Sequence, residues 1–219
     1  MRVMEAPADS PQPALPADWA ARLKARLRPA PDHEFEHSRI GTRSATREAI
    51  PEPLTPAAVL VPIVARLAEP TLLLTVRASH LRSHAGQISF PGGRVEPGDA
   101  DVRAAALRET HEEIGIGAAA IEPLGFLDDQ IVRTGYRITP LVALLQPGFR
   151  LVPDRTEVAE VFELPLSFAL TAGNYRSRPG RARGLEFEIW ELPYGERNIW
   201  GATAGILANL REVLGMEPS

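Results

Sequence analysis

The sequence predicts an α/β or α+β domain, in which helices pack on the faces of a β-sheet. From Leu60 onward, short apolar segments alternate with turn residues, as is typical of strands and their connections. Two other segments carry apolar residues at the 3.6-residue spacing of amphipathic helices. With 219 residues, of which 44% are hydrophobic, the chain is long enough to bury a substantial core. This mixture of strands and helices indicates a layered domain.

The expected elements follow one another with turn signals between most of them. Glu69-Pro70-Thr71 is expected to join the first two strands as a hairpin. An arginine-rich segment at 176–183 contains proline and glycine, and we expect it to be a loop. The expected strands are 59–66, 72–77, 123–128, 137–145 and 185–192, and the expected helices are 102–114 and 202–214.

Proline marks the first boundary, because nine of the 21 prolines lie within the first 56 residues. Such a composition is typical of a tail or linker. We therefore divide the chain into a Pro-rich extension over 1–54, a main domain over 55–214 and a short C-terminal tail over 215–219.

A short helix is expected inside the extension, over 19–27. Asp18 is its candidate N-cap, and Trp19, Leu23 and Leu27 share one apolar face. We expect this helix to dock on the main domain rather than to bind a membrane or a partner protein.

Composition excludes several classes of protein. The chain has no cysteine, which rules out a disulfide framework, a thiolate zinc site and a cysteine nucleophile. A balance of 24 basic and 28 acidic residues gives no reason to expect nucleic-acid binding. The longest apolar run, 57–65, contains a proline and is too short to span a membrane. Without a signal or transit pattern, we expect a cytoplasmic protein.

The chemistry is concentrated between Phe90 and Ile116. Phe90-Pro91-Gly92-Gly93 leaves a strand and enters a loop, where the two glycines allow the backbone to approach a ligand closely. A helix then begins, with Asp99 or Asp101 as its candidate N-cap, and Gly115 ends it.

Three carboxylates share one face of that helix, because Glu109, Glu112 and Glu113 are spaced at i, i+3 and i+4. Ala105, one turn earlier, is expected to leave room in front of them. Like charges this close repel one another unless a cation binds them. Oxygen ligands without cysteine or paired histidines favour Mg²⁺ or Mn²⁺ over zinc. A solvated acidic face is the alternative explanation, and the neighbouring glycine loop favours the metal site.

These residues resemble a known signature. Gly93, followed at 108–116 by Arg-Glu-Thr-His-Glu-Glu-Ile-Gly-Ile, is similar to the Nudix box of the Nudix hydrolases. One departure is that Gly93 and Arg108 are 15 positions apart, one more than in the general box. The first acidic residue of the box is replaced by the region of Asp99 and Asp101.

The longer loop resembles the coenzyme A pyrophosphatase branch of the family. That branch has a second signature upstream of the box, and looser similarity continues downstream, so that the resemblance covers about 55–214. The upstream signature is matched by Leu73-Leu74-Thr75-Val76-Arg77-Ala78, Arg82, Gly86 and Phe90-Pro91-Gly92-Gly93.

The resemblance implies an α/β/α sandwich with a mixed β-sheet and a catalytic loop-helix-loop. It also implies hydrolysis of the coenzyme A diphosphate to 3',5'-ADP and 4'-phosphopantetheine, with Mg²⁺ or Mn²⁺. Glu109 and Glu113 would bind metal, and Glu112 would be a ligand or the general base. A backbone carbonyl of Gly92 or Gly93 is a further candidate ligand. Outside the box, the resemblance offers Glu157 or Glu160, either of which is otherwise an ordinary exposed acid.

The arginines at motif positions have different expected roles. Arg108 is expected to orient a glutamate, whereas Arg77 and Arg82 are candidates for binding substrate phosphate through their guanidinium groups. A salt bridge that braces the loop is the alternative for these two. His111 is expected to point away from the glutamates, and His84, in the loop leading to the site, is left without a role.

Two other functions remain open from the sequence. The first is a Nudix hydrolase for another nucleotide derivative, such as ADP-ribose or NADH. The second is a catalytically silent Nudix domain that senses a nucleotide. The sequence leaves open the preferred coenzyme A derivative and whether the protein is a monomer or a homodimer.

Overall fold

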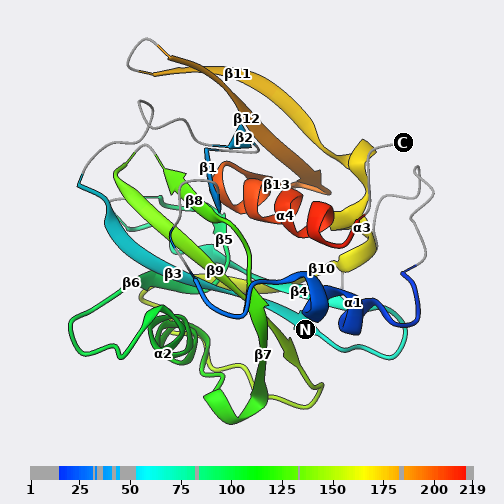
Figure 1. Cartoon of the computed structure of the whole chain (residues 1–219). Helices are drawn as coiled ribbons and strands as arrows, with labels where there is room; N and C mark the ends of the chain where they lie inside the picture. The colour runs from blue at the N-terminus through cyan, green and yellow to red at the C-terminus, as the bar shows by residue number, and fades with distance from the viewer. Residues whose placement is uncertain are drawn as a thin grey trace.

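The computed structural model describes residues 15–31, 33, 37–40, 43–44, 53–81, 84–132, 134–182 and 185–215. Its elements pack as three layers, with the main sheet between helix α2 on one face and helix α4 on the other (Figure 1). A smaller sheet covers the outer side of α4 (Figure 1). This arrangement is the α/β/α sandwich with a mixed sheet that the sequence predicts.

The elements are α1 (Trp19–Arg26), β1 (Ser38–Ile40), β2 (Arg43–Ser44), β3 (Thr55–Val64), β4 (Thr71–Arg77), β5 (Ile88–Ser89), β6 (Gly92–Arg94), α2 (Val102–Ile114), η3 (Ala118–Ala120), β7 (Ile121–Phe126), β8 (Asp129–Val132), β9 (Tyr136–Leu145), β10 (Val158–Pro165), α3 (Leu166–Leu170), η4 (Ala172–Asn174), β11 (Arg176–Ala182), β12 (Leu185–Tyr194), β13 (Arg197–Trp200) and α4 (Ala202–Val213).

Ten of the strands in the described part of the chain form the main sheet, along the path β10-β4-β3-β9-β8-β1-β2. Strands β5, β6 and β7 pair with β4, β3 and β9 beside this path. The central pair, β3 and β9, is parallel over its whole length, whereas β3 pairs with β4 and β6 in antiparallel fashion. Strand β6, which carries the two glycines of the loop, is therefore held against the centre of the sheet.

Alternation along the strands builds a separate core on each face of the sheet. Leu60 and Leu141 are fully buried and pack in the cluster that contains Ile114 of α2. Their neighbour Val61 points to the opposite face, into the cluster that contains Ile206 of α4. The acidic helix is thus fixed to one face by buried apolar contacts.

The N-terminal helix packs on the domain, as expected. Leu23 is fully buried and Leu27 is 7% exposed, and both belong to the core on the α4 face. The expected cap at Asp18 was wrong, because its side chain caps no backbone N–H and instead accepts a hydrogen bond from Arg22 Nε at 2.9 Å. In the part of the chain that is described, no helix is both long and apolar enough to cross a membrane.

Several strands were not expected from the sequence, and β10 and β11 are the longest of them. The segment expected to be a loop, 176–183, is largely β11, which pairs with β12 from Arg176 to Ala182. Cross-strand pairing therefore overrides the local turn signal of Pro179-Gly180. Strand β10 was also missed, because Glu160 and Glu163 interrupt its apolar residues and only the pairing with β4 identifies it as a strand.

Candidate active site

The helix that carries the glutamates, α2, has the expected bounds and caps. Its N-terminus is capped by Asp101, whose side chain accepts a hydrogen bond from the Ala104 N–H at 2.8 Å. Its last turn ends at Gly115, where φ is 75° and the N–H donates to the His111 carbonyl at 2.9 Å. Only glycine adopts this left-handed conformation without strain. The caps therefore fix where the carboxylates sit along the helix.

Two glycines bring the preceding loop into contact with that helix. A Cβ on Gly93 would lie 2.5 Å from Glu109 Oε1, so a side chain there would collide with the carboxylate. Gly92 has φ 152°, and a Cβ on it would lie 2.3 Å from the Ala58 carbonyl oxygen. Its N–H instead donates to Glu113 Oε2 at 3.2 Å. The loop backbone thus touches two of the three glutamates.

Glu113 is the most unusual acid in the site, because its residue is only 4% exposed. Burial raises the pKa of Glu113 to about 7, against the opposing effects of the Gly92 N–H and of Arg77. Glu109 and Glu157 raise it further through like charge. The nearest cation is Arg77, whose Nη1 lies 3.8 Å from Glu113 Oε1. The carboxylate is therefore desolvated and only partly neutralised.

Arg108 connects the loop with the acidic face. Its guanidinium binds Asp99 through two hydrogen bonds of 2.9 and 3.0 Å, which lower the pKa of Asp99. It also donates to Glu109 Oε1 at 3.0 Å and to Glu112 Oε2 at 2.9 Å. A fifth bond goes to the Arg94 carbonyl at 3.1 Å. The expected orienting role of Arg108 is thus consistent with its contacts, and Asp99 takes the other end of the guanidinium.

Two features of the helix face differ from the expectation. Glu112 is much more exposed than the other two glutamates, with its side chain 57% exposed, although it shares Arg108 Nη1 with Glu109. Ala105 leaves no room in front of the carboxylates, since it is fully buried against the sheet. The i, i+3, i+4 spacing places three acids on one side of the helix without making their environments equal.

Of the two acids expected outside the box, the structure brings Glu157 to the site. Its charge raises the pKa values of both Glu109 and Glu113. Glu157 is also fixed through its backbone, since its carbonyl accepts from the Ala78 N–H at 2.8 Å, just beyond Arg77. Glu160 is not brought in, because it forms an ion pair of 2.6 Å with Arg197 of β13, the strand next to α4.

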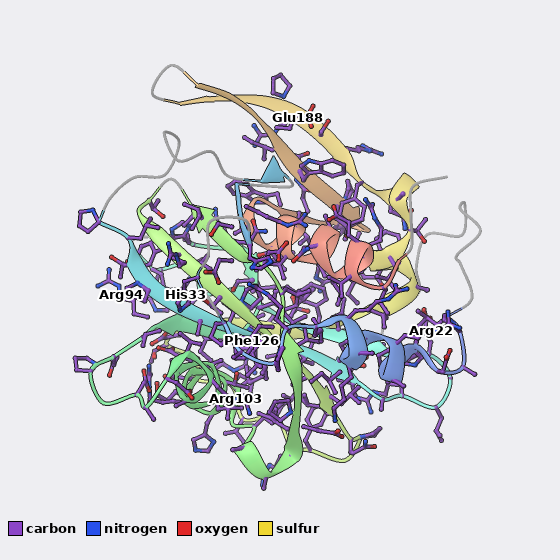
Figure 2. All side chains as sticks on the ribbon, viewed as in Figure 1. Arg22, His33, Arg94, Arg103, Phe126 and Glu188 are labelled. Atoms are coloured by element: carbon purple, nitrogen blue, oxygen red, sulfur yellow. The ribbon has the colours of Figure 1, made fainter. Side chains whose placement is uncertain are left out.

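The arginine expectations have separate outcomes. Arg77 lies beside Glu113, and its Nε is buried without a hydrogen-bond partner among the described residues. Arg82 lies outside the described residues. His111 is exposed, and Phe90 is 2% exposed in the core. Arg103 also lies on α2, where its guanidinium stands 5.8 Å from the centre of the Phe126 ring of β7 (Figure 2).

Sequence reasoning gave no role to the polar residues around Arg77. Thr75 and Ser89 lie opposite each other on β4 and β5, with their hydroxyl oxygens 3.2 Å apart. Gln87 follows in the same turn as His84. The Arg77 N–H donates to the Gln87 carbonyl at 2.9 Å. The usable signal was the alternation of Thr75 and Arg77 on one face of a strand, which becomes meaningful once β5 is known to pair there.

The donors in this site fit a hard divalent cation. Buried Glu113, half-buried Glu109 and the nearby charge of Glu157 supply carboxylate oxygens whose mutual repulsion a cation would relieve. As they are placed, no three His, Asp or Glu side chains of the described residues are close enough together to hold an ion. These residues therefore suit a divalent cation by the chemistry of their oxygen donors and by their shared negative charge.

Comparisons with known proteins give one consistent result. The family model of the NUDIX domain matches residues 54–182. The chain is 44% identical over 162 residues to an uncharacterized Nudix hydrolase, NudL, of Enterobacter sp. (strain 638). It is 45% identical over 162 residues to the NudL of Escherichia coli O1:K1. Each alignment covers 74% of this chain and 84% of the relative.

A solved structure has the same fold. The crystal structure of a Nudix hydrolase from M. smegmatis, RenU, matches with a TM-score of 0.51 at 20% identity. The match covers 75% of this chain and 88% of that protein.

Proposed function

This chain belongs to the Nudix hydrolase family, and from that premise we propose that it cleaves the diphosphate of coenzyme A or a close derivative. The products are 3',5'-ADP and 4'-phosphopantetheine. Family membership supports a hydrolase of phosphoric anhydrides in nucleoside diphosphate derivatives. The choice of coenzyme A is supported by the upstream signature from Leu73 to Gly93, which includes Arg77.

The observation that supports this reaction most directly is the environment of Glu113. A desolvated carboxylate lies between a backbone N–H and an arginine, with a second glutamate on the same helix. Hydrolysis of a diphosphate needs anionic groups that hold a cation, and positive groups for the charge that develops on the phosphate oxygens. Both kinds of group meet at this point of the structure.

Nudix hydrolases generally use divalent metal ions, and we assign Mg²⁺ or Mn²⁺ to this one because the donors are oxygens. Glu109 and Glu113 would hold the metal, with Glu157 as a further ligand. Both glycines are in register with β3, and of their two carbonyls we favour that of Gly92, because the N–H of this residue donates to Glu113. When bound, the cation polarises the phosphate oxygens and lowers the pKa of a coordinated water.

We assign Glu112 to holding the attacking water. Its side chain reaches solvent while Arg108 fixes its direction, as a general base requires. The water oxygen bonds to one phosphorus, the bridging P–O bond breaks, and the water proton passes to the carboxylate. Arg108 acts through Glu109 and Glu112 and is a positioning residue.

Arg77 is assigned to the substrate phosphates. Its Nε is a buried donor without a partner among the described residues, and its Nη1 is already near Glu113. A phosphate oxygen would satisfy that donor with a charge-assisted bond. Arg82 is predicted from the sequence to have the same role. A cytoplasmic location is also a prediction from the sequence.

The test is product analysis. Wild-type protein is incubated with equal concentrations of coenzyme A, its disulfide, an acyl thioester, ADP-ribose and NADH, each with Mg²⁺ and with Mn²⁺. Release of 3',5'-ADP at the highest kcat/KM from a coenzyme A compound supports the proposal. Faster turnover of ADP-ribose or NADH assigns another Nudix substrate. If nothing is released and Glu113→Gln leaves nucleotide binding unchanged, a sensing domain is the better explanation.

A further inference from the structure

The turn before β5 is built around Arg77. The His84 carbonyl accepts from the Gln87 N–H at 3.1 Å, and Gly86 between them has φ 71°. The end of this turn is bound to the backbone of Arg77 through two hydrogen bonds: the Gly86 N–H donates to the Arg77 carbonyl at 3.1 Å, and the Arg77 N–H donates to the Gln87 carbonyl. Gly86 and Gln87 thus both stand opposite Arg77, which is the pattern of a glycine β-bulge. Bulges of this kind are common beside active sites, where they redirect a side chain.

The side chain of Gln87 shares a face with that of Arg77. Ser89 is paired with Thr75, and side chains two positions apart along a strand point to the same side. Gln87 and Arg77 are each two positions from this pair, on the face where Arg77 meets Glu113. The side chain of Gln87 therefore points to the same side of the sheet as that of Arg77.

His84 has a backbone conformation that is uncommon for residues other than glycine. Its φ is 60°, in the left-handed region. Its ring is tethered, because Nδ1 lies 2.6 Å from Gln87 Oε1. The residue is exposed, and no hydrogen bond joins Nε2 to any of the described residues. The turn that binds the Arg77 backbone thus carries one imidazole nitrogen without a hydrogen-bond partner among the described residues.

We propose that His84 and Gln87, together with Arg77, form the phosphate-binding side of the site: in the imidazolium form of His84, Nδ1–H donates to Gln87 Oε1 and Nε2–H donates to an oxygen of the substrate diphosphate. The inference rests on the proposed function and names further residues that hold the same diphosphate. A glycine would form this turn with less strain, so the imidazole at position 84 is available for a role beyond the turn. Arg77 Nε also has no hydrogen-bond partner among the described residues, and it is the second donor that we assign to the diphosphate.

The variant His84→Gly separates the two roles, because glycine keeps the turn and removes the imidazole. We measure the affinity of the full-length protein for α,β-methylene-ADP, a diphosphate that cannot be hydrolysed, by calorimetry with Mg²⁺. We expect Kd to rise about tenfold, as for loss of one hydrogen bond to a charged group. KM for coenzyme A rises similarly, kcat stays within about twofold and Tm is unchanged or higher.

A matched control is available in His33, the other histidine with positive φ, at 56°. His33 lies on the N-terminal segment, and its Nδ1 is 2.9 Å from Asp129 Oδ2. His33→Gly removes the same side chain from the same kind of backbone and should leave Kd and KM unchanged. An equal rise of Kd in this control would mean that the effect is not local, and would overturn the proposal. So would unchanged Kd and KM in His84→Gly.

A second variant keeps the test decisive if His84→Gly loses Tm. Gln87→Ala keeps the imidazole and removes the amide that orients it, and should raise Kd for the analogue several-fold. An unchanged Kd refutes the proposal. If wild-type protein binds the analogue through His84 but hydrolyses no substrate of the panel, the proposed function fails and this inference stands. If the protein hydrolyses coenzyme A with a KM that does not depend on His84, the proposed function stands and this inference fails. Absence of analogue binding by wild-type protein also overturns the inference.

Discussion

Position 93 requires glycine because the Glu109 carboxylate leaves no space for a side chain, and not because of its backbone conformation. The missing Cβ would lie 2.5 Å from Glu109 Oε1, and no positive φ is involved. Gly93→Ala must therefore move either the loop or Glu109. We expect kcat to fall at least about tenfold, because misplacing a group of the reacting site by an ångström has large effects on rate. Steady-state kinetics with saturating Mg²⁺ checks this.

The control for that variant is Gly98→Ala in the same loop. Nothing lies within 4 Å of a Cβ built there. Its kcat should match that of the wild type, and equal losses in both variants would show that the loop tolerates no side chain at all.

Glu113 predicts how the metal-free protein responds to pH. Burial raises its pKa to about 7 from 4.5, so between these values the folded protein keeps a proton that the unfolded chain has released. The contribution of this group to the free energy of unfolding therefore falls as pH rises through that range, by about 3 kcal/mol in total. Glu113→Gln imitates the protonated form and should remove this loss. In EDTA, its Tm should exceed that of the wild type at about pH 8 but not at about pH 4.5. An equal difference at both pH values would contradict the assignment.

At the scale of elements, Arg108 is the connection between the loop after β6 and helix α2. It binds Asp99, Glu109, Glu112 and the Arg94 carbonyl through one planar guanidinium. Lysine keeps the charge but lacks the fork needed for several directed bonds. Arg108→Lys should lower kcat about tenfold, with a small loss of Tm.

A matched substitution on the same helix is Arg103→Lys, since Arg103 packs over Phe126 instead. It should keep wild-type kcat, as measured by the same assay. If both variants lose activity equally, the effect belongs to α2 as a whole.

The same elements show how far sequence patterns reach. Helix α2 was predicted with its observed bounds, because its periodicity, N-cap and terminal glycine are all local signals. The separation of Glu112 from Glu113 was not predictable, since it depends on the loop that covers Glu113 and on Arg108 reaching Asp99. Strand β11 was missed for a related reason, because its partner β12 supplies the pairing that Pro179-Gly180 argues against.

At the scale of the whole molecule, composition separated the Pro-rich N-terminal extension from the domain, but it did not predict how closely part of it is attached. Helix α1 contributes to the core, and β1 pairs with β8 in the main sheet. Arg39 extends this attachment by binding Asp128 at 2.5 Å and Glu212 of α4 at 2.7 Å. The described part of the extension therefore joins the sheet to the C-terminal helix. Such long-range contacts leave no periodic trace in a segment rich in proline.

The structural role of the extension is tested by Leu23→Ala. Leu23 is fully buried in the core shared with α4, and removal of a buried leucine side chain typically lowers the free energy of unfolding by about 2–5 kcal/mol. For a chain of this size, Tm should fall by roughly 5–15 °C in calorimetry. Arg22→Ala, in the same helix at a side chain that is 53% exposed, should change Tm by about 1–2 °C at most. KM for the substrate should stay at the wild-type value in both variants, because neither side chain reaches the glutamates. Wild-type stability of Leu23→Ala would show that the helix is attached to the domain without supporting it.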